Sequence, residues 1–452
     1  MPSPSLGPRL VIAGTHSGAG KTTVATGLLA ALRAAGERPA GAKVGPDFID
    51  PGYHAVACGR PPRNLDPWLC GEESILPLAA RAGDGAGVLV VEGVMGMFDG
   101  SSDGTPSSTA DVARLLGAPI VLVVDASAMS GSIAAMVHGY ASFDPTVTVG
   151  GVILNQVGSE GHATLLREAL EPLGIPVLGA LPRDDRLTWR DRHLGLVPVV
   201  EHRAEVDESI RALAAIVSEH VDLAAIVRMA QGAATVNTAP VALPAGGPRF
   251  RVAVAGGRAF SFTYTDTLDA LEAAGAEVVP FDPLQDETLP EGVDGALIGG
   301  GFPEVHAGEL SANHRLLADL RRRVDSGLPL WAECGGLLLL AEELNGHRMA
   351  GVVAGAASLT SRLTLGYREA VTRAESPIGP PRTRFRGHEF HYSTVDPPGD
   401  ALELSSRWGT RLEGWATPSL LATYVHHHPG GDPRAVESFS RRCALRRTLR
   451  LA

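Results

Sequence analysis

Residues 14–23, GTHSGAGKTT, combine the residue types that can hold a chain of phosphates. The glycines permit a tight loop whose backbone N–H groups surround phosphate oxygens. Lys21 would reach the terminal phosphates, and the hydroxyl of Thr22 would bind Mg²⁺. The spacing departs from G-x-x-x-x-G-K-[ST], because Thr15 stands where the first glycine is expected. The predicted nucleotide-binding residues are Gly14, Thr15, Gly18, Gly20, Lys21, Thr22, Thr23 and Asn155.

Two observations bear on this loop. Only two of the 39 basic residues are lysines, Lys21 and Lys43, so we expect both positions to need a compact ammonium group. Asn155 ends a predicted strand, where its amide could read a nucleotide base or form a turn. The alternative for residues 14–23 as a whole is a glycine-rich turn before an ordinary helix.

Mg²⁺ also needs carboxylate ligands, and two carboxylates are predicted at the ends of strands. Asp47 lies in the segment KVGPDFIDP, and Glu92 directly follows an apolar run. Because parallel sheets bind ligands at the carboxyl ends of their strands, the predicted metal ligands are Thr22, Asp47 and Glu92. Asp99, in a glycine-flanked loop, could reach the same site. The alternative for Asp47, Asp50 and Asp99 is a turn or cap carboxylate, and this is our interpretation of Asp50.

A second site is predicted around Cys334, in the segment LWAECGGLLLL. A strand that runs directly into a helix exposes the residue at the turn, and a helix N-terminus favours a thiolate there. A thiol nucleophile needs a base, and His426 follows a later apolar stretch. Gly299–Gly301 would supply free N–H groups for an oxyanion. The alternative for Cys334 is a buried structural cysteine.

These residues require an α/β framework to position them. In the first 230 residues, short apolar runs alternate with segments of helical spacing, which predicts a parallel sheet with helices on both faces. The Gly150-Gly151 pair predicts a bulge. The predicted strands are Leu10–Ala13, Val88–Val91, Ile120–Val124 and Val147–Leu154, and the predicted helices are Lys21–Ala35, Thr109–Leu116, Met129–Tyr140 and His162–Leu173.

The pattern stops at residue 231 and then restarts, which predicts two domains. Residues 231–248 lack periodicity and are rich in Gly, Pro and Ala. We therefore predict domains at 1–232 and 249–452, joined by a linker at 233–248. The predicted elements of the second domain are strands Arg251–Ala255, Glu277–Pro280, Ala296–Ile298 and Leu328–Ala332, and helix Thr265–Ala274.

The composition of the chain argues against several classes of protein. The net charge of −11, without a basic block, argues against a nucleic-acid partner. No apolar run approaches the roughly 18–20 residues of a membrane span, and no secretory signal is evident. Four sparse cysteines predict neither a disulfide framework nor a zinc site, so we expect a cytoplasmic protein. The oligomeric state stays open, with a homodimer among the candidates.

The motifs together resemble those of the cobyrinate a,c-diamide synthases of corrinoid biosynthesis. The resemblance covers nearly the whole chain. It implies a P-loop domain similar to dethiobiotin synthetase, which binds ATP, Mg²⁺ and the macrocycle, and a C-terminal domain similar to class I glutamine amidotransferases. The motifs are GTHSGAGKTT, KVGPDFIDP, EGVMGMFDG, VILNQV, IGGGFPE, AECGG, RGHEFHYS and ATYVHHH.

The resemblance also implies roles for individual residues. Cys334 would attack the carboxamide of glutamine and release ammonia, with His426 as its base. Many relatives carry a Glu two residues after this His, but His428 stands there, so a Cys–His dyad is expected. Asp99 would lie near the reacting carboxylate. The substrates would be glutamine, ATP and a corrinoid polycarboxylate, whose a and c acetates become acyl phosphates and then amides. Residues implied to hold Mg-ATP are Lys21, Thr22, Asp47 and Glu92.

Two other interpretations remain at this stage. A regulatory or partitioning ATPase would share the phosphate loop but would not need Cys334 and His426. A related amidotransferase could act on nickel sirohydrochlorin, a cobyric acid precursor or a cell-wall lipid precursor. A polycarboxylate substrate also requires a basic pocket, for which the candidates are Arg362, Arg368, Arg384 and Arg386.

Overall fold

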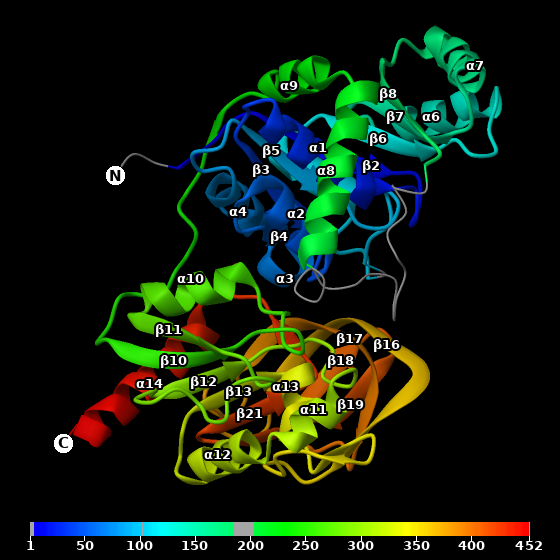
Figure 1. Ribbon diagram of the computed structural model, residues 1–452. Helices are drawn as coiled ribbons and strands as arrows, with labels where there is room; N and C mark the ends of the chain where they lie inside the picture. Colours follow the sequence, from blue (N-terminus) through cyan, green and yellow to red (C-terminus); the bar gives the residue numbers. More distant parts are fainter. Residues whose placement is uncertain (1–3, 102, 185–202, 452) are drawn as a thin grey trace. The chain divides into compact units, whose positions relative to one another are not determined.

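A computed structural model of the chain describes residues 4–101, 103–184 and 203–451. The chain divides into two compact units, Met1–Val241 and Ala242–Ala452 (Figure 1). Each unit has its own buried apolar core beside a sheet that is mainly parallel. The two α/β sheets agree with the fold class that the alternating pattern predicts.

The sheet of the first unit has seven strands, and every neighbouring pair is parallel. Its central strands are buried on both faces, which explains why they are continuous apolar runs. In spatial order the strands are β4 (Arg63–Leu65), β3 (Pro39–Val44), β5 (Val88–Glu92), β2 (Arg9–Gly14), β6 (Ile120–Asp125), β7 (Val149–Val157) and β8 (Val177–Pro182).

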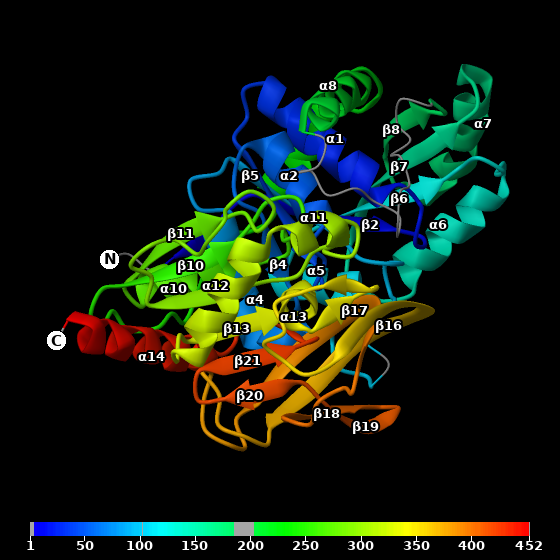
Figure 2. The same cartoon turned by 60° about the horizontal axis from the view of Figure 1, so that its bottom comes forward.

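Helices lie against this sheet, and α8 runs alongside α1 (Figures 1 and 2). Gly27 permits this contact, because a Cβ there would lie 2.6 Å from Val217 Cγ2. Helix α5 coincides with its predicted bounds, and a capping box between Ser108 and Asp111 fixes its start. The helices are α1 (Lys21–Ala34), α2 (Asp50–Cys58), α3 (Pro67–Cys70), α4 (Ile75–Ala82), α5 (Thr109–Leu116), α6 (Ser132–Ser142), α7 (Glu160–Leu170), α8 (Arg203–His220) and α9 (Leu223–Gln231).

The bulge predicted in β7 is confirmed. Ile120 of β6 pairs with Val149, whereas Val121 pairs with Gly151, so Gly150 is the extra residue. After the bulge the register continues to the strand ends, where Asp125 lies opposite Asn155. The bulge therefore helps to set the position of Asn155 at the carboxyl edge of the sheet.

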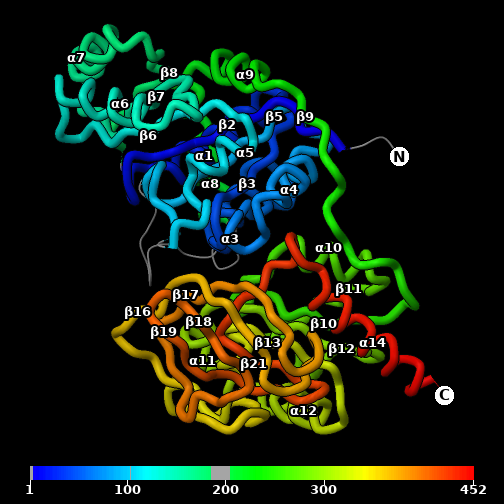
Figure 3. Tube along the Cα trace, turned by 180° about the vertical axis from the view of Figure 1, so that it is seen from behind, coloured from blue at the N-terminus to red at the C-terminus, as the bar shows by residue number. Residues whose placement is uncertain are grey.

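The segment predicted as a linker, residues 233–248, begins with regular structure. Strand β9 (Val236–Asn237) pairs antiparallel with β1 (Ser5–Leu6), so the chain returns to its own N-terminal segment (Figure 3). Residues 238–248 contain no helix or strand. The division between the two units falls within this second part.

The second unit contains a six-stranded sheet that is parallel except for its last strand. In spatial order its strands are β11 (Ala276–Phe281), β10 (Phe250–Ala255), β12 (Gly295–Ile298), β13 (Leu330–Glu333), β21 (Leu420–Thr423) and β20 (Trp415–Thr417). The helices of the unit are α10 (Thr265–Ala273), α11 (Ala307–Ala312), α12 (His314–Asp325), α13 (Gly335–Leu340) and α14 (Arg434–Leu451).

A second sheet in this unit was not predicted. Its long strands β16 (Ala356–Thr372) and β17 (Arg384–Asp396) pair antiparallel (Figure 2). On β17, Glu389 and His391 are buried while Phe390 is exposed, which inverts the usual apolar alternation and hides the strand. The other strands are β14 (Glu343–Leu344), β15 (His347–Arg348), β18 (Leu402–Ser406), β19 (Gly409–Glu413) and β22 (His426–His427).

Within residues 4–101, 103–184 and 203–451, no helix has both the length and the apolar character that crossing a membrane requires.

Candidate active sites

The predicted phosphate loop connects β2 to α1. Gly18 and Gly20 have φ values of 86° and 94°, which favour glycine. The side chain of Lys21 folds back over Gly14, where a Cβ would lie 2.8 Å from Lys21 Cγ. Its ammonium donates a hydrogen bond to the carbonyl of His16 at 3.0 Å. A side chain at position 14 would displace this lysine, so glycine there leaves room for Lys21.

Asn155 supports this loop from the neighbouring strand. Its amide nitrogen donates to the carbonyl of Ala19 at 3.1 Å, and a Cβ on Gly20 would collide with the same amide. The amide oxygen is buried, with no hydrogen-bond partner among the described residues. Asn155 thus holds the loop in place. Its predicted contact with a nucleotide base remains a proposal.

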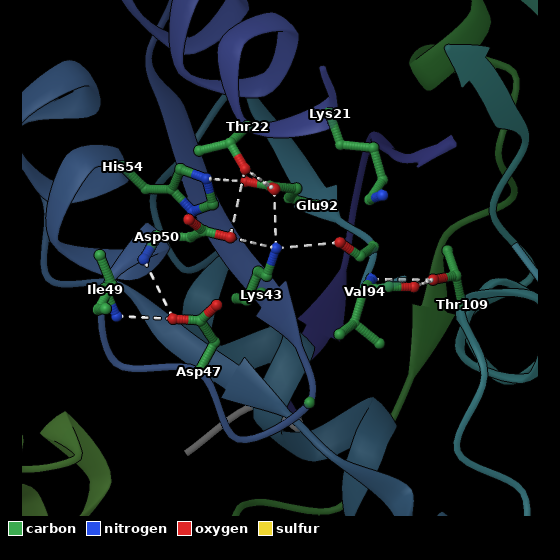
Figure 4. Close-up of polar contacts among 12 residues, drawn as sticks. Lys21, Thr22, Lys43, Asp47, Ile49, Asp50, His54, Glu92, Val94 and Thr109 are labelled. Carbon is green, nitrogen blue, oxygen red and sulfur yellow. Dashed lines mark hydrogen bonds and ion pairs between the residues drawn. The ribbon is translucent and has the colours of Figure 1, made fainter. Parts of the chain in front are cut away.

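A buried group of charges lies directly behind the loop (Figure 4). Parallel pairing of β3 and β5 sets Lys43 level with Glu92, and the ammonium lies 2.7 Å from Glu92 Oε1. The same ammonium lies 2.5 Å from Asp50 Oδ2 at the start of α2. His54 Nε2 lies 2.6 Å from Glu92 Oε2, and the Thr22 hydroxyl donates to Glu92 Oε1 at 2.7 Å. The start of α1 is therefore connected to β3, β5 and α2.

Burial makes these charges depend on one another. Burial alone would lower the pKa of Lys43, but Asp50 and Glu92 more than compensate and raise it above its ordinary value. Burial opposes ionisation of Glu92, yet Lys43 and His54 hold its pKa below the usual range. For Asp50, burial and the neighbouring Asp47 raise the pKa. Lys43 therefore keeps its charge while buried between two carboxylates.

The interpretation of Asp50 as a turn carboxylate is wrong, because it faces Lys43 and accepts a hydrogen bond from Thr22 at 3.3 Å. The turn role belongs to Asp47, whose Oδ1 accepts from the backbone N–H groups of Ile49 and Asp50. His54 was missed, although its spacing of four from Asp50 puts both on one face of α2.

The oxygen donors of this site suit Mg²⁺. The hydroxyl of Thr22 lies within 3.3 Å of carboxylate oxygens of Asp50 and Glu92, and Mg²⁺ prefers such hard ligands. Within the described ranges, no group of three or more His, Cys, Asp or Glu side chains could hold a metal ion on its own. Mg²⁺ that enters with a nucleotide needs fewer protein ligands, since phosphates and water complete its shell.

Asp99 lies at the mouth of the loop. Its Oδ2 accepts from the N–H of Gly96 at 2.8 Å, and a Cβ on Gly96 would lie 3.1 Å from the carbonyl oxygen of Thr15. The same carbonyl accepts a hydrogen bond from the hydroxyl of Tyr140. The side chain of Asp99 is exposed. An exposed carboxylate next to the phosphate loop can contact a substrate there.

Cys334 occupies the turn between β13 and α13. Its φ of 48° is unusual for a non-glycine residue and marks a sharp, strained turn. Its N–H donates to the carbonyl of Thr423 at 2.8 Å, which fixes the turn to β21. A Cβ on Gly336 would collide with the carbonyl of Ile298, so this position requires glycine. These contacts agree with the predicted elbow.

His426 and Cys334 flank the same glycine loop. A Cβ on Gly300 would lie 2.5 Å from His426 Cε1, and a Cβ on Gly335 would lie 3.3 Å from the carbonyl carbon of Gly300. The expectation of free N–H groups holds only in part, because Gly300 N donates to Phe262 O at 3.0 Å. The amide nitrogen of Gly301 lies 3.1 Å from the position of a Cβ on Gly335, and it is the candidate oxyanion donor.

The expected thiolate is wrong for the free protein. Burial raises the pKa of the Cys334 thiol, and the carboxylates of Glu304 and Glu389 raise it further. The side chain is only 5% exposed. The resting group is therefore a thiol, and a base has to accept its proton when a substrate is attacked.

The motif RGHEFHYS contributes buried polar residues near this turn. Glu389 pairs with Arg368 at 2.5 Å and also with Arg411. Against burial, a hydrogen bond with His391 and the charges of these two arginines hold its pKa at about 2. His391 stacks on Tyr424 with ring centroids 3.8 Å apart. Arg368 is thus engaged inside the unit and does not form part of an open basic pocket. Of the other candidates, Arg362, Arg384 and Arg386 are exposed.

Two family models match the chain. A CobQ/CobB/MinD/ParA nucleotide binding domain matches residues 10–197, and a CobB/CobQ-like glutamine amidotransferase domain matches residues 251–433. These matches assign a nucleotide-binding role to the first unit and amidotransferase chemistry to the second.

Similar proteins extend over both units. Hydrogenobyrinate a,c-diamide synthase of Streptomyces coelicolor is 48% identical over 96% of this chain and 97% of its own length. The Mycobacterium tuberculosis protein of the same name is 46% identical, covering 95% and 96%. Cobyrinate a,c-diamide synthase of Synechococcus is 41% identical, covering 96% and 98%. The chain belongs to the hydrogenobyrinate and cobyrinate a,c-diamide synthase family of glutamine-dependent, C–N bond-forming ligases.

Proposed function

We propose that this protein converts the a and c acetate carboxylates of hydrogenobyrinate into amides, with ATP and glutamine as co-substrates. One observation carries the proposal: Cys334 sits at a strained elbow against the glycine loop on which His426 also packs, in a chain that also presents Lys21 in a phosphate loop. Five relatives named for hydrogenobyrinate are 45–48% identical to this chain, and three named for cobyrinate are 38–42% identical. Hydrogenobyrinate is therefore the proposed acceptor.

In the second unit, the thiol of Cys334 attacks the carboxamide carbon of glutamine. His426 accepts the thiol proton and returns it to the departing nitrogen, so that ammonia leaves and a glutamyl thioester remains. The N–H of Gly301 is placed to stabilise the oxyanion. Water then hydrolyses the thioester to glutamate. Ammonia made inside a protein escapes the protonation that dominates in neutral water.

In the first unit, a substrate carboxylate attacks the terminal phosphate of ATP. An acyl phosphate forms, ADP leaves, and ammonia displaces phosphate to give the amide. Lys21 neutralises charge on the transferred group, and Asp99, which is exposed next to the phosphate loop, orients the acceptor. Thr22, Asp50 and Glu92 are the residues that would hold Mg²⁺, which supplies charge neutralisation when bound. Asp47 is proposed to contact the ion only through water.

ATP binding should weaken as pH rises. Burial and the neighbouring Lys43 lower the pKa of Lys21 to about 8. Phosphate binds the ammonium form, which the free protein loses as pH rises through this value. The Kd for ATP should therefore increase between pH 7 and pH 9, by about tenfold per pH unit above the pKa. Calorimetry at constant ionic strength measures this dependence. In Lys21→Arg the side chain stays charged over this range, so the Kd for ATP should change little with pH. An equal pH dependence of the Kd in both proteins would contradict the prediction.

The acceptor is tested by product mass. The purified protein is incubated with ATP and glutamine and, separately, with hydrogenobyrinate, cobyrinate or nickel sirohydrochlorin. Two acid-to-amide conversions on hydrogenobyrinate, with a higher kcat/KM than for cobyrinate, support the proposal. Amidation of nickel sirohydrochlorin alone, or of none of the three, rejects it.

We also propose that the protein works in the cytoplasm, where ATP and glutamine are available. All four of its cysteines are free and buried, in keeping with a reducing compartment. A homodimer is the proposed assembly, and light scattering tests it.

A further inference from the structure

We propose that Glu333, the residue immediately before the nucleophile, is the positioning residue that completes the Cys334–His426 pair as a triad. The inference rests on the proposed function, in which His426 is the base. The residue two positions after His426 is His428, which cannot act as the carboxylate found in many relatives. The structure instead supplies a carboxylate from the end of β13.

The side chain of Glu333 is held in place by two contacts. Its Oε1 accepts a hydrogen bond from the backbone N–H of His427 at 3.1 Å. Its Oε2 lies 3.6 Å from His426 Nδ1. The side chain is only 10% exposed, so its interaction with the imidazole is weakly screened. One carboxylate therefore anchors the backbone after His426 and faces the ring of His426.

The two ring nitrogens of His426 face different partners. Nδ1 is directed toward Glu333. Nε2 lies on the other side of the ring, 3.1 Å from the position that a Cβ on Gly300 would occupy. Gly300 in turn lies against Gly335, the residue after Cys334, so the Cε1–Nε2 edge of the ring packs on the glycine loop next to this turn. A carboxylate at Nδ1 favours a proton on that nitrogen and leaves Nε2 to accept the thiol proton.

The strand register explains how this arrangement is maintained. Glu333 pairs with Thr423 between parallel strands β13 and β21. The backbone N–H of Cys334 donates a hydrogen bond to the carbonyl of the same threonine. The chain then reaches His426 three residues later. The carboxylate and the nucleophile are thus consecutive residues on a buried strand end, which fixes the carboxylate relative to both members of the pair.

A second buried carboxylate, that of Asp266, lies near His428. Asp266 Oδ2 lies 3.7 Å from His428 Nε2, and the ring of His428 packs on Tyr264 with centroids 4.5 Å apart. These contacts direct His428 toward α10 and its preceding residue. Asp266→Asn is therefore the matched comparison for the loss of a buried carboxylate near the histidine segment.

The experiment measures glutamine hydrolysis by the full chain carrying Glu333→Gln. We expect kcat to fall by about 100-fold or more while the KM for glutamine changes little, since the tautomer and orientation of His426 are lost but the binding surface is kept. Amidation with an ammonium salt in place of glutamine should stay near the unmodified level, because it bypasses Cys334. Asp266→Asn and the exposed Glu343→Gln should leave kcat within about threefold.

Three results would overturn the inference. Normal kcat in Glu333→Gln would show that the carboxylate does not support His426. A parallel loss of ammonium-dependent amidation would indicate a general structural defect. A larger kcat loss in Asp266→Asn than in Glu333→Gln would assign the role to the other carboxylate. Glutamine hydrolysis by Cys334→Ser at the normal rate is a different failure, since it removes the proposed function itself.

Discussion

Replacement of Cys334 by Ser is expected to abolish glutamine hydrolysis, with a fall in kcat of at least about 10³-fold. A serine hydroxyl is a far weaker nucleophile than a thiol that transfers its proton to His426. The change is nearly isosteric in a side chain that is 5% exposed, so the fold should persist. Glutamine-dependent amidation should disappear with it.

The same variant should still form amides when an ammonium salt replaces glutamine. The first unit carries its own phosphate loop and does not need the thiol for activation of the acceptor. Cys58→Ser is the matched control, because Cys58 is a buried free cysteine of the first unit. It should keep both activities. Loss of ammonium-dependent amidation in folded Cys334→Ser would contradict the division of labour between the units.

Replacement of Lys21 by Ala is expected to impair amidation and to leave glutamine hydrolysis intact. Amidation from either nitrogen source should fall by at least about 100-fold, because the ammonium that neutralises the transferred phosphate is removed. Glutamine hydrolysis should continue, since Cys334 and His426 belong to the second unit. Glutamate release and product formation, measured in the same reaction, separate the two activities.

Arg33→Ala provides the control for Lys21→Ala, because Arg33 is an exposed basic residue at the opposite end of α1. It should leave amidation unchanged. Glu92→Ala should also abolish amidation, but it removes the partner of buried Lys43 and would destabilise the unit by about 3–5 kcal/mol. Lys21→Ala is the cleaner test. Equal loss of hydrolysis and amidation in this variant would reject the separate roles.

The parts of the sites that sequence predicted are local in the chain. The phosphate loop follows from a strand, three glycines, Lys21 and a helix in succession, and the elbow follows from a strand, Cys334 and two glycines. Such segments determine their backbone path through neighbouring residues. The rarity of lysine also identified Lys43 before its partners were known.

The parts that sequence missed depend on contacts between distant segments. Lys43 meets Glu92 only through the register of β3 and β5, and this pairing brings Asp50 from its expected turn into the buried group. Glu333 meets His426 through the pairing of β13 and β21. Strand β17 escaped detection because most of its inward side chains are polar, among them Glu389. Hydrophobic periodicity carries no information on such pairings.

The most direct test of the account follows two isotopes in one reaction. Hydrogenobyrinate labelled with ¹⁸O in its carboxylates is incubated with ATP and with glutamine labelled with ¹⁵N in the side-chain amide. Mass spectrometry then measures the isotope content of the inorganic phosphate and of the amide product. Activation through an acyl phosphate predicts one ¹⁸O in inorganic phosphate for each amide formed, and every new amide should carry ¹⁵N. Unlabelled phosphate, or an amide nitrogen that does not come from glutamine, would contradict the account.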